Sequence, residues 1–242
     1  CIYVQPRYVN YTIEQTVERV GKLAGRVREL RQMSEAVVYH LGHELTLETH
    51  GIVPGNNWFE RVHYLSKDPN WAVTIRKKFS RMISDLIAVC KENYRYPFSY
   101  AAMAWGEIDL VPWSLECFES VGVDAYVQPG VGWTEDYIAD LLSRLKQYGK
   151  PVICTEAGCM SYSGASIIAG VVPEVWSDLV PDQNEQADYI DRYCQLLNRS
   201  RIDGYFYTNY NDPYDFDKGY GLYCGRKRKK GFYMYKSYKQ TG

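Results

Sequence analysis

Two glutamates each stand at the end of a short apolar segment of the chain. Glu44 lies in the segment GHELT at residues 42–46, and Glu156 lies in PVICTEAG at residues 151–158. Three further strand–helix units would fill the distance between them. One carboxyl group can protonate the leaving oxygen of a glycoside while a second attacks the sugar carbon. The two glutamates therefore predict cleavage of a glycosidic bond, provided that the fold brings both to the same edge of a sheet.

Short apolar segments alternate with amphipathic segments along the chain. The expected strands are residues 2–5, 36–39 (running on into 40–44), 98–105, 121–127, 152–155 and 204–207, and the expected helices are 12–31, 73–93, 134–148 and 184–198. Strands that are apolar throughout are buried on both faces, which indicates a parallel sheet covered by helices. No glycine-rich phosphate loop follows any of these strands, which weighs against a nucleotide-binding open sheet.

Polar side chains recur just after the predicted strands, at residues 43–44, 105–107, 126, 156 and 209–212. An α/β fold of the (β/α)8 TIM-barrel type carries its active face at these strand ends. The predicted strands are two fewer than eight, and the chain opens on an apolar segment at Cys1 rather than on Met. We therefore expect residues 1–242 to form a single, partial TIM-barrel domain that lacks the first two strands. The open edges of such a barrel predict aggregation or dimerisation, and the sequence does not fix the oligomeric state.

Composition limits the partners of this chain. Its formal net charge is −1, which gives no general attraction to nucleic acid or to anionic membranes. No apolar run approaches the roughly 18 residues of a membrane helix. The seven cysteines include no close-spaced metal pair and predict reduced thiols in a cytoplasmic protein, while a missing start leaves secretion open. The basic run at residues 225–231 predicts a solvated loop rather than a nucleic-acid patch.

Several short motifs resemble known glycoside hydrolases. TEAG at residues 155–158 resembles the nucleophile strand of clan A glycoside hydrolases, and GHE at 42–44 resembles the acid/base strand of that clan. More closely, GHELTL at 42–47 with GIVPG at 51–55 is similar to a bacterial TIM-barrel family whose members are often labelled abortive infection proteins. YAA at 100–102, WS at 113–114, GVDAY at 122–126 and DP at 212–213 agree with that family.

The resemblance implies a role for each matching residue. Glu156 would be the nucleophile and Glu44 the general acid/base, about 5–5.5 Å apart, in a retaining reaction on a carbohydrate that needs no cofactor. Tyr126 would hydrogen-bond Glu156 and hold it in place. The predicted substrate-binding residues are His43, Tyr126, Trp105, Arg7, Tyr207 and Asn209. Arg7 suits either a carboxylate in the cleft or an acid at the barrel rim.

Two positions depart from the clan A pattern. His43 stands where the clan has Asn, and a neutral imidazole can still donate one hydrogen bond to a sugar hydroxyl. A protonated His43 would instead lower the pKa of Glu44 and oppose its role as an acid. The tryptophan expected on the last barrel strand is absent, so stacking on the sugar would fall to Tyr207, Trp105 or Trp133.

Other functions fit some of the same residues. HLGHE at residues 40–44 suggests a metal-dependent hydrolase, but in a regularly alternating strand His40 points away from His43. A non-catalytic barrel, binding carbohydrate or serving an antiphage role, would keep the cleft and lose the acids.

The simpler interpretation of Trp105 and Glu107 is core packing and a surface charge. The long loop at residues 158–181 is expected to cover the cleft and to set substrate choice.

Overall fold

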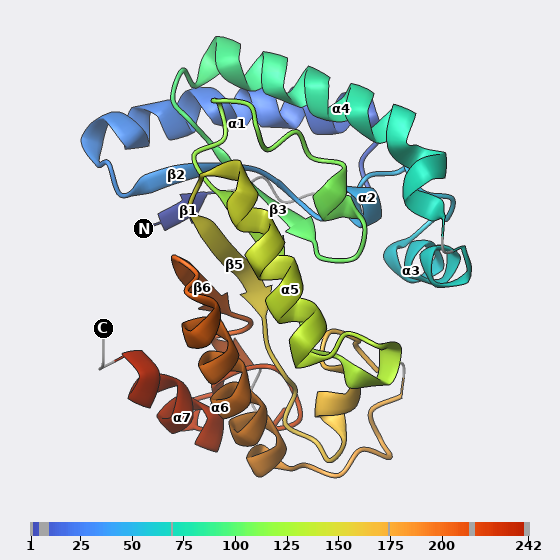
Figure 1. Ribbon diagram of the computed structural model, residues 1–242, viewed down its shortest axis with the longest axis vertical. Helices are drawn as coiled ribbons and strands as arrows, with labels where there is room; N and C mark the ends of the chain where they lie inside the picture. The colour runs from blue at the N-terminus through green and yellow to red at the C-terminus, as the bar shows by residue number, and fades with distance from the viewer. Residues whose placement is uncertain (1, 5–9, 69, 174, 213–215, 240–242) are drawn as a thin grey trace. The chain divides into compact units, whose positions relative to one another are not determined.

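The computed structural model describes residues 2–4, 10–68, 70–173, 175–212 and 216–239, which form both strands and helices (Figure 1). The chain divides into two compact units, Cys1–Val123 and Asp124–Gly242. Arg7, a predicted substrate-binding residue, lies outside the described residues. No helix in the described part is both long enough and apolar enough to cross a membrane.

The first unit contains parallel strands that pair in the order in which they occur. They are β1 (Ile2–Val4), β2 (Val37–His43) and β3 (Ser99–Met103), and β4 (Val121–Asp124) ends the unit. The helices are α1 (Ile13–Met33), α2 (Leu45–Glu48), α3 (Trp58–Lys67) and α4 (Trp71–Asn93), with a short 3-10 helix η1 at Glu107–Asp109. Long helices α1 and α4 lie side by side in Figure 1.

Helix α1 shows how the local sequence sets these boundaries. It begins after Thr12, whose hydroxyl accepts from the Gln15 N–H while the Gln15 side chain accepts from the Thr12 N–H, and the two bonds form a capping box. Its Val20, Ala24 and Val27 recur at helical spacing and are fully buried. The strand β2 that follows is buried along almost its whole length, as predicted for a strand covered on both faces.

The second unit repeats the same construction. Strands β5 (Val152–Ala157) and β6 (Gly204–Tyr207) pair in parallel, and the helices are α5 (Glu135–Leu145), α6 (Gln183–Ser200) and α7 (Lys230–Lys239). Short 3-10 helices are η2 (Pro129–Val131), η3 (Lys146–Tyr148) and η4 (Ala165–Ile168). A small sheet joins β7 (Asn211–Asp212) in parallel to β8 (Tyr223–Cys224), which pairs antiparallel with β9 (Lys227–Arg228). Helices α6 and α7 lie together (Figure 1).

The predicted α/β class is confirmed, and several boundaries differ. The strand expected at 98–105 ends at Met103, and the one expected at 121–127 ends at Asp124, although the residues that follow, Ala104 and Ala125, are also buried. The sequence pattern does not predict helices α3 and α7. Helix α3 is short and begins at an Asn57 cap, and α7 is a tyrosine- and lysine-rich segment with little apolar periodicity.

The basic run at residues 225–231 is not simply the solvated loop that its charge predicts. Its middle part forms β9, where Lys227 and Arg228 are exposed. Lys229 is only 1% exposed and forms an ion pair with Asp212, Nζ to Oδ2 2.5 Å. A run of charges predicts exposure only while no buried acceptor is available, and here the fold supplies one.

Candidate active site

The end of β2 is irregular just before Glu44. His40 pairs with Ser99 and His43 with Ala101, so three steps along β2 match two steps along β3. Such a bulge breaks the regular alternation of side chains and re-aims the residues beside it. The expectation that His40 and His43 point in opposite directions therefore loses its basis, because it assumes an unbroken alternation.

His40 is buried and neutral in β2. Its side chain is 3% exposed, and its Nδ1 lies 2.6 Å from the Ser99 hydroxyl. Burial, with a smaller contribution from His43, lowers the pKa of His40 to about 3, so this imidazole is neutral at physiological pH. The contact with Ser99 engages Nδ1 and fixes the orientation of this buried ring.

Glu44 has an unusual backbone conformation. It lies between β2 and α2 with φ 41° and ψ 47°, in the left-handed region. Its N–H donates to the Ala101 carbonyl at 2.9 Å, and its side chain is half-buried. A non-glycine residue in this region costs about 1–2 kcal/mol, and such strain gathers at functional sites. The surrounding structure must therefore hold Glu44 in place.

The buried carboxylate of Glu107 supplies that support. Its Oε1 accepts from the Thr46 N–H at 3.4 Å and from the Tyr100 hydroxyl, and its Oε2 accepts from the Thr46 hydroxyl at 3.2 Å. The Tyr100 oxygen in turn accepts from the Leu45 N–H at 3.1 Å. These bonds satisfy the first amides of α2, which directly follow Glu44.

The expected surface charge at Glu107 is thus wrong. The residue is fully buried, and η1 turns it back toward β3, where Oε2 also accepts from the Met103 N–H at 3.3 Å. Burial raises the pKa of Glu107 above its ordinary value, while its hydrogen bonds act in the opposite direction. Local sequence does not reveal this setting, because Thr46 is distant in the chain.

In the second unit, Glu156 also sits beside an irregular register. Cys154 pairs with Tyr205 and Ala157 with Tyr207, so β5 contains one residue more than β6 at this point. The half-buried Glu156 lies inside this bulge. The Tyr126 hydroxyl donates to Oε1 of Glu156 at 2.6 Å. The contact expected between these two side chains is present.

Helix α6 holds the backbone on both sides of Tyr126. The Tyr193 hydroxyl donates to the Ala125 carbonyl at 2.5 Å, and the Tyr189 oxygen accepts from the Val127 N–H at 3.1 Å. The rings of Tyr189 and Tyr193 are stacked with centroids 5.7 Å apart. Burial raises the pKa of both phenols far above the ordinary value, so both remain neutral donors or acceptors. The motifs do not single out these two residues, and their spacing of four along α6 is the sequence signal that could have found them.

The segment that precedes Tyr126 is tied to β5 as well. The Thr155 hydroxyl donates to Oδ1 of Asp124 at 2.8 Å, and the Ala125 N–H donates to the Glu156 carbonyl at 3.0 Å. Asp124 is 3% exposed. Side chains and main chain therefore fix β5 against residues 124–127, and with them the position of Glu156 relative to Tyr126.

Tyr220 completes the surroundings of this pair within the second unit. Its ring lies at 65° to that of Tyr126 with centroids 6.3 Å apart, and its hydroxyl donates to the Ala169 carbonyl at 2.5 Å. Burial is the largest cause that raises the pKa of Tyr220, and the charge of Glu156 acts in the same direction. A neutral phenol therefore stands beside the Tyr126–Glu156 pair.

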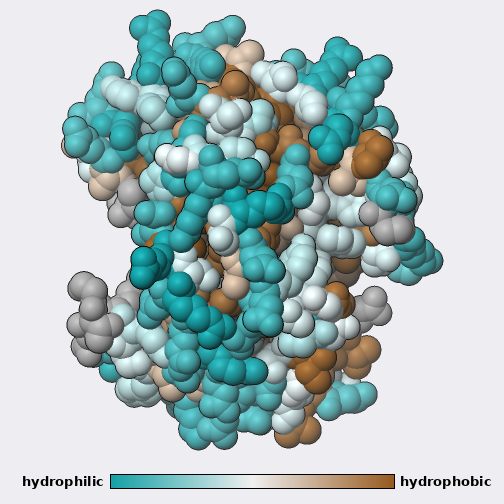
Figure 2. Space-filling model, viewed as in Figure 1, coloured by the Kyte–Doolittle hydropathy of each residue, from teal (hydrophilic) through white to brown (hydrophobic). Residues whose placement is uncertain are grey.

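The loop between β5 and α6 packs against Tyr126. A Cβ added to Gly170 would lie 3.0 Å from Cγ of Tyr126 and 2.8 Å from Nε2 of Gln128. A bridge between Tyr162 and Pro181 closes the base of the loop. Figure 2 shows hydrophobic side chains at the surface in this region, at lower right. The exposed apolar side chains of the loop are Ile167, Val171, Val172, Val175 and Val180.

The other predicted substrate-binding residues have mixed settings. Trp105 is half-buried, with its ring edge-on to Trp71 at 5.8 Å. The Tyr207 hydroxyl donates to the Cys159 carbonyl at 3.0 Å and its ring packs on Tyr235, so this side chain serves the core. Asn209 is exposed, and its carbonyl accepts from the Leu222 N–H at 3.2 Å. His43 is half-buried at the end of β2.

A family model described as Glycoside Hydrolase Family 113 matches residues 73–223 of the chain. This match includes Tyr126 and Glu156, while Glu44 lies before it. No curated protein matches the sequence. The comparisons give no support to a label of abortive infection protein.

Solved structures resemble the fold at low sequence identity. A family 113 β-1,4-mannanase is 16% identical with a TM-score of 0.53, over 99% of this chain and 97% of that one. The β-mannanase of Alicyclobacillus acidocaldarius is 14% identical with a TM-score of 0.57, over 95% of this chain and 63% of its own. A β-glucuronidase of Bacteroides uniformis is 14% identical with a TM-score of 0.63, over 98% of this chain and 28% of its own.

Proposed function

This chain belongs to glycoside hydrolase family 113, and on that premise we propose that it cleaves β-1,4-linked mannose chains with Glu156 as nucleophile and Glu44 as acid/base. The observation that carries the proposal is the 2.6 Å hydrogen bond from Tyr126 to Glu156. A hydrogen bond to the charged form keeps a carboxylate ionised, as a nucleophile requires. Mannose is proposed because the similar family 113 structures are β-mannanases.

The proposed reaction is a double displacement that retains the anomeric configuration. Glu156 attacks the anomeric carbon while Glu44 donates its proton to the departing glycosidic oxygen. The product is a glycosyl ester on Glu156 and a freed sugar hydroxyl. Water then attacks the anomeric carbon of this ester, Glu44 takes the proton from that water, and Glu156 leaves as a carboxylate. Tyr126 holds Glu156 in the ionised form before attack and again after release.

Strain at Glu44 supports its proposed role. The left-handed backbone and the bulge in β2 both change the direction of the carboxyl group. Glu107 hydrogen-bonds the first turn of α2, which directly follows Glu44, and so holds that turn in place. A general acid must meet the leaving oxygen within hydrogen-bond reach, so geometry outweighs the energetic cost of the conformation. Closure of the sheet into an eight-stranded barrel forms part of the same proposal.

The test compares four proteins on β-1,4-mannan, mannose oligosaccharides and aryl β-mannosides. Glu156→Gln is expected to abolish measurable turnover, and Glu44→Gln to lower kcat about 10²–10⁴-fold on substrates with poor leaving groups. Glu116→Gln changes an exposed carboxylate and is the matched control. A fluorinated mannoside that traps the glycosyl ester should label the peptide containing Glu156. No turnover by the parent on any of these substrates, or full activity of Glu156→Gln, would overturn the proposal.

A further inference from the structure

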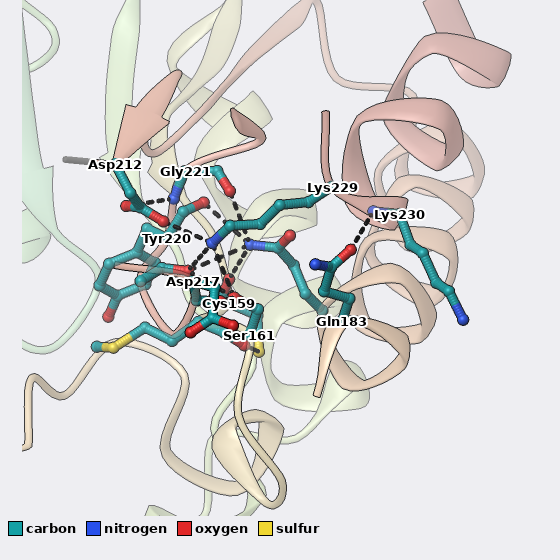
Figure 3. Close-up of polar contacts among 12 residues, drawn as sticks. Cys159, Ser161, Gln183, Asp212, Asp217, Tyr220, Gly221, Lys229 and Lys230 are labelled. Carbon is teal, nitrogen blue, oxygen red and sulfur yellow. Dashed lines mark hydrogen bonds and ion pairs between the residues drawn. The ribbon is translucent and has the colours of Figure 1, made fainter. Parts of the chain in front are cut away.

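A buried ion pair in the second unit lies outside the proposed chemistry. Lys229 and Asp212 are 1% and 6% exposed, with Nζ and Oδ2 2.5 Å apart. The Lys229 ammonium also donates to the Ser161 hydroxyl at 2.8 Å and to the Gly219 carbonyl at 3.1 Å. Figure 3 shows Lys229 reaching into this group while the neighbouring Lys230 points away from it. All three protons of the ammonium thus have an acceptor, which a buried lysine requires.

The ion pair hydrogen-bonds the residues on both sides of Tyr220. Lys229 binds the Gly219 carbonyl on one side, and Oδ1 of Asp212 accepts from the Gly221 N–H at 2.8 Å on the other. Both flanking positions are glycine because a Cβ at either would lie within 2.4 Å of an Asp212 atom. The Asp212 side chain and backbone can therefore approach the Tyr220 segment more closely than any larger residue would allow.

Gln186 of α6 ties the same segment to the residues that follow Glu156. Its Nε2 donates to the Tyr220 carbonyl at 3.1 Å and to the Cys159 carbonyl at 3.0 Å. The Gln186 side chain is fully buried. Ser161, which receives the Lys229 bond, donates in turn to the Asp217 carbonyl (Figure 3). The end of β5 and the Tyr220 segment are thus joined through one polar cluster.

We propose that Lys229, Asp212 and Gln186 are positioning residues of the active site, because they hold Tyr220 against Tyr126 and so keep the Tyr126 hydroxyl on Glu156. The inference rests on the proposed function of Glu156. None of these three side chains is proposed to touch the sugar. Their effect passes through Tyr220, which is the member of the cluster whose ring contacts Tyr126.

Loss of the Lys229 charge should loosen this arrangement. The Lys229→Met variant leaves Asp212 buried without its cation and removes one hydrogen bond each from the Gly219 carbonyl and the Ser161 hydroxyl. Residues 217–223 should then sample more conformations, and the Tyr126–Glu156 bond should form for less of the time. Because the cluster acts on the nucleophile and not on the sugar, kcat should fall while KM changes little.

The test measures hydrogen exchange and kinetics together in the full chain. We expect Lys229→Met to raise exchange in residues 158–162, 217–223 and 124–128, but not in α5. With a mannose oligosaccharide, kcat should fall about tenfold or more while KM stays within about threefold. Lys230→Met removes an exposed lysine from the adjacent position and should match the parent in both measurements. Equal exchange in the Lys229 and Lys230 variants, or raised exchange with an unchanged kcat, would overturn the inference.

Two additional variants keep the inference testable if Lys229→Met does not fold. Asp212→Asn keeps the shape of its side chain, and Tyr220→Leu removes the ring while leaving the ion pair intact. Tyr220→Leu should lower kcat as Lys229→Met does, without raising exchange at residues 158–162. A parent protein without any turnover would refute the proposed function. Hydrogen exchange at residues 124–128 would still test the role of the cluster, because Lys229→Met should raise exchange there if the cluster positions Tyr126.

Discussion

At the scale of the residue, variants of Glu44 separate the free-energy cost of its strained backbone from the catalytic contribution of its carboxyl group. Its left-handed conformation favours glycine, so Glu44→Gly should be more stable than Glu44→Gln by roughly 0.5–1 kcal/mol. Both variants should lose about 10²–10⁴-fold in kcat on substrates with poor leaving groups, since neither can donate a proton. Urea unfolding of the two variants measures the first effect. Equal stabilities would mean that the backbone of Glu44 is unstrained.

Glu107 predicts a particular dependence of stability on pH. Burial raises its pKa in the folded state, so the folded protein keeps this proton more tightly than the unfolded chain does. The stability that this group contributes is full below the ordinary glutamate pKa and is lost as pH rises through the raised value. The free energy of unfolding of the parent should therefore fall relative to Glu107→Gln as pH rises from about 4 to 7. A constant difference between the two proteins, or one that grows with pH, would contradict this.

At the scale of the element, the loop between β5 and α6 should control the position of Tyr126. Gly170→Ala places a methyl group 3.0 Å from the Tyr126 ring, so the ring or the loop that carries residue 170 must shift. Overpacking of this kind costs about 1–3 kcal/mol, and displacement of a residue bound to the nucleophile can lower kcat by up to about 10²-fold. Ile167→Ala, at a site 55% exposed on the same loop, should leave both quantities nearly unchanged. Thermal unfolding and kcat of the two variants test the expectation.

Elements are easier to predict than the contacts between them. The periodicity of residues 13–33 and the Thr12 capping box are sufficient to place α1, because helix signals are local. The bulges before Glu44 and at Glu156 depend on the register of a partner strand, which a single strand does not encode. Each bulge lies beside a glutamate that the motifs single out, so the residue types are predictable and their orientation is not.

Charged residues show the same limit. The basic run predicts a solvated Lys229, yet its acceptors Asp212 and Ser161 are 17 and 68 residues away in the chain. Local sequence likewise predicts Glu107 at the surface, and its partner Thr46 is 61 residues away. A charged side chain is buried only where the fold brings enough hydrogen-bond and ion-pair partners around it. The burial of Lys229 and Glu107 therefore could not be predicted from local composition.

At the scale of the whole molecule, buried cysteines can test whether the chain folds as the single domain that its sequence predicts. Cys90 in the first unit is fully buried, as is Cys154 in the second. Burial raises the pKa of Cys90, and that of Cys154 to about 12, so neither thiol should react while its surroundings stay folded. One cooperative transition requires both thiols to become reactive at the same urea concentration. Pulsed alkylation followed by mass spectrometry measures the two midpoints separately, and an unstructured cysteine peptide added to each pulse corrects for the reactivity of the reagent in urea. Clearly different midpoints would show that the two units unfold independently, and the chain would then have to be regarded as two domains.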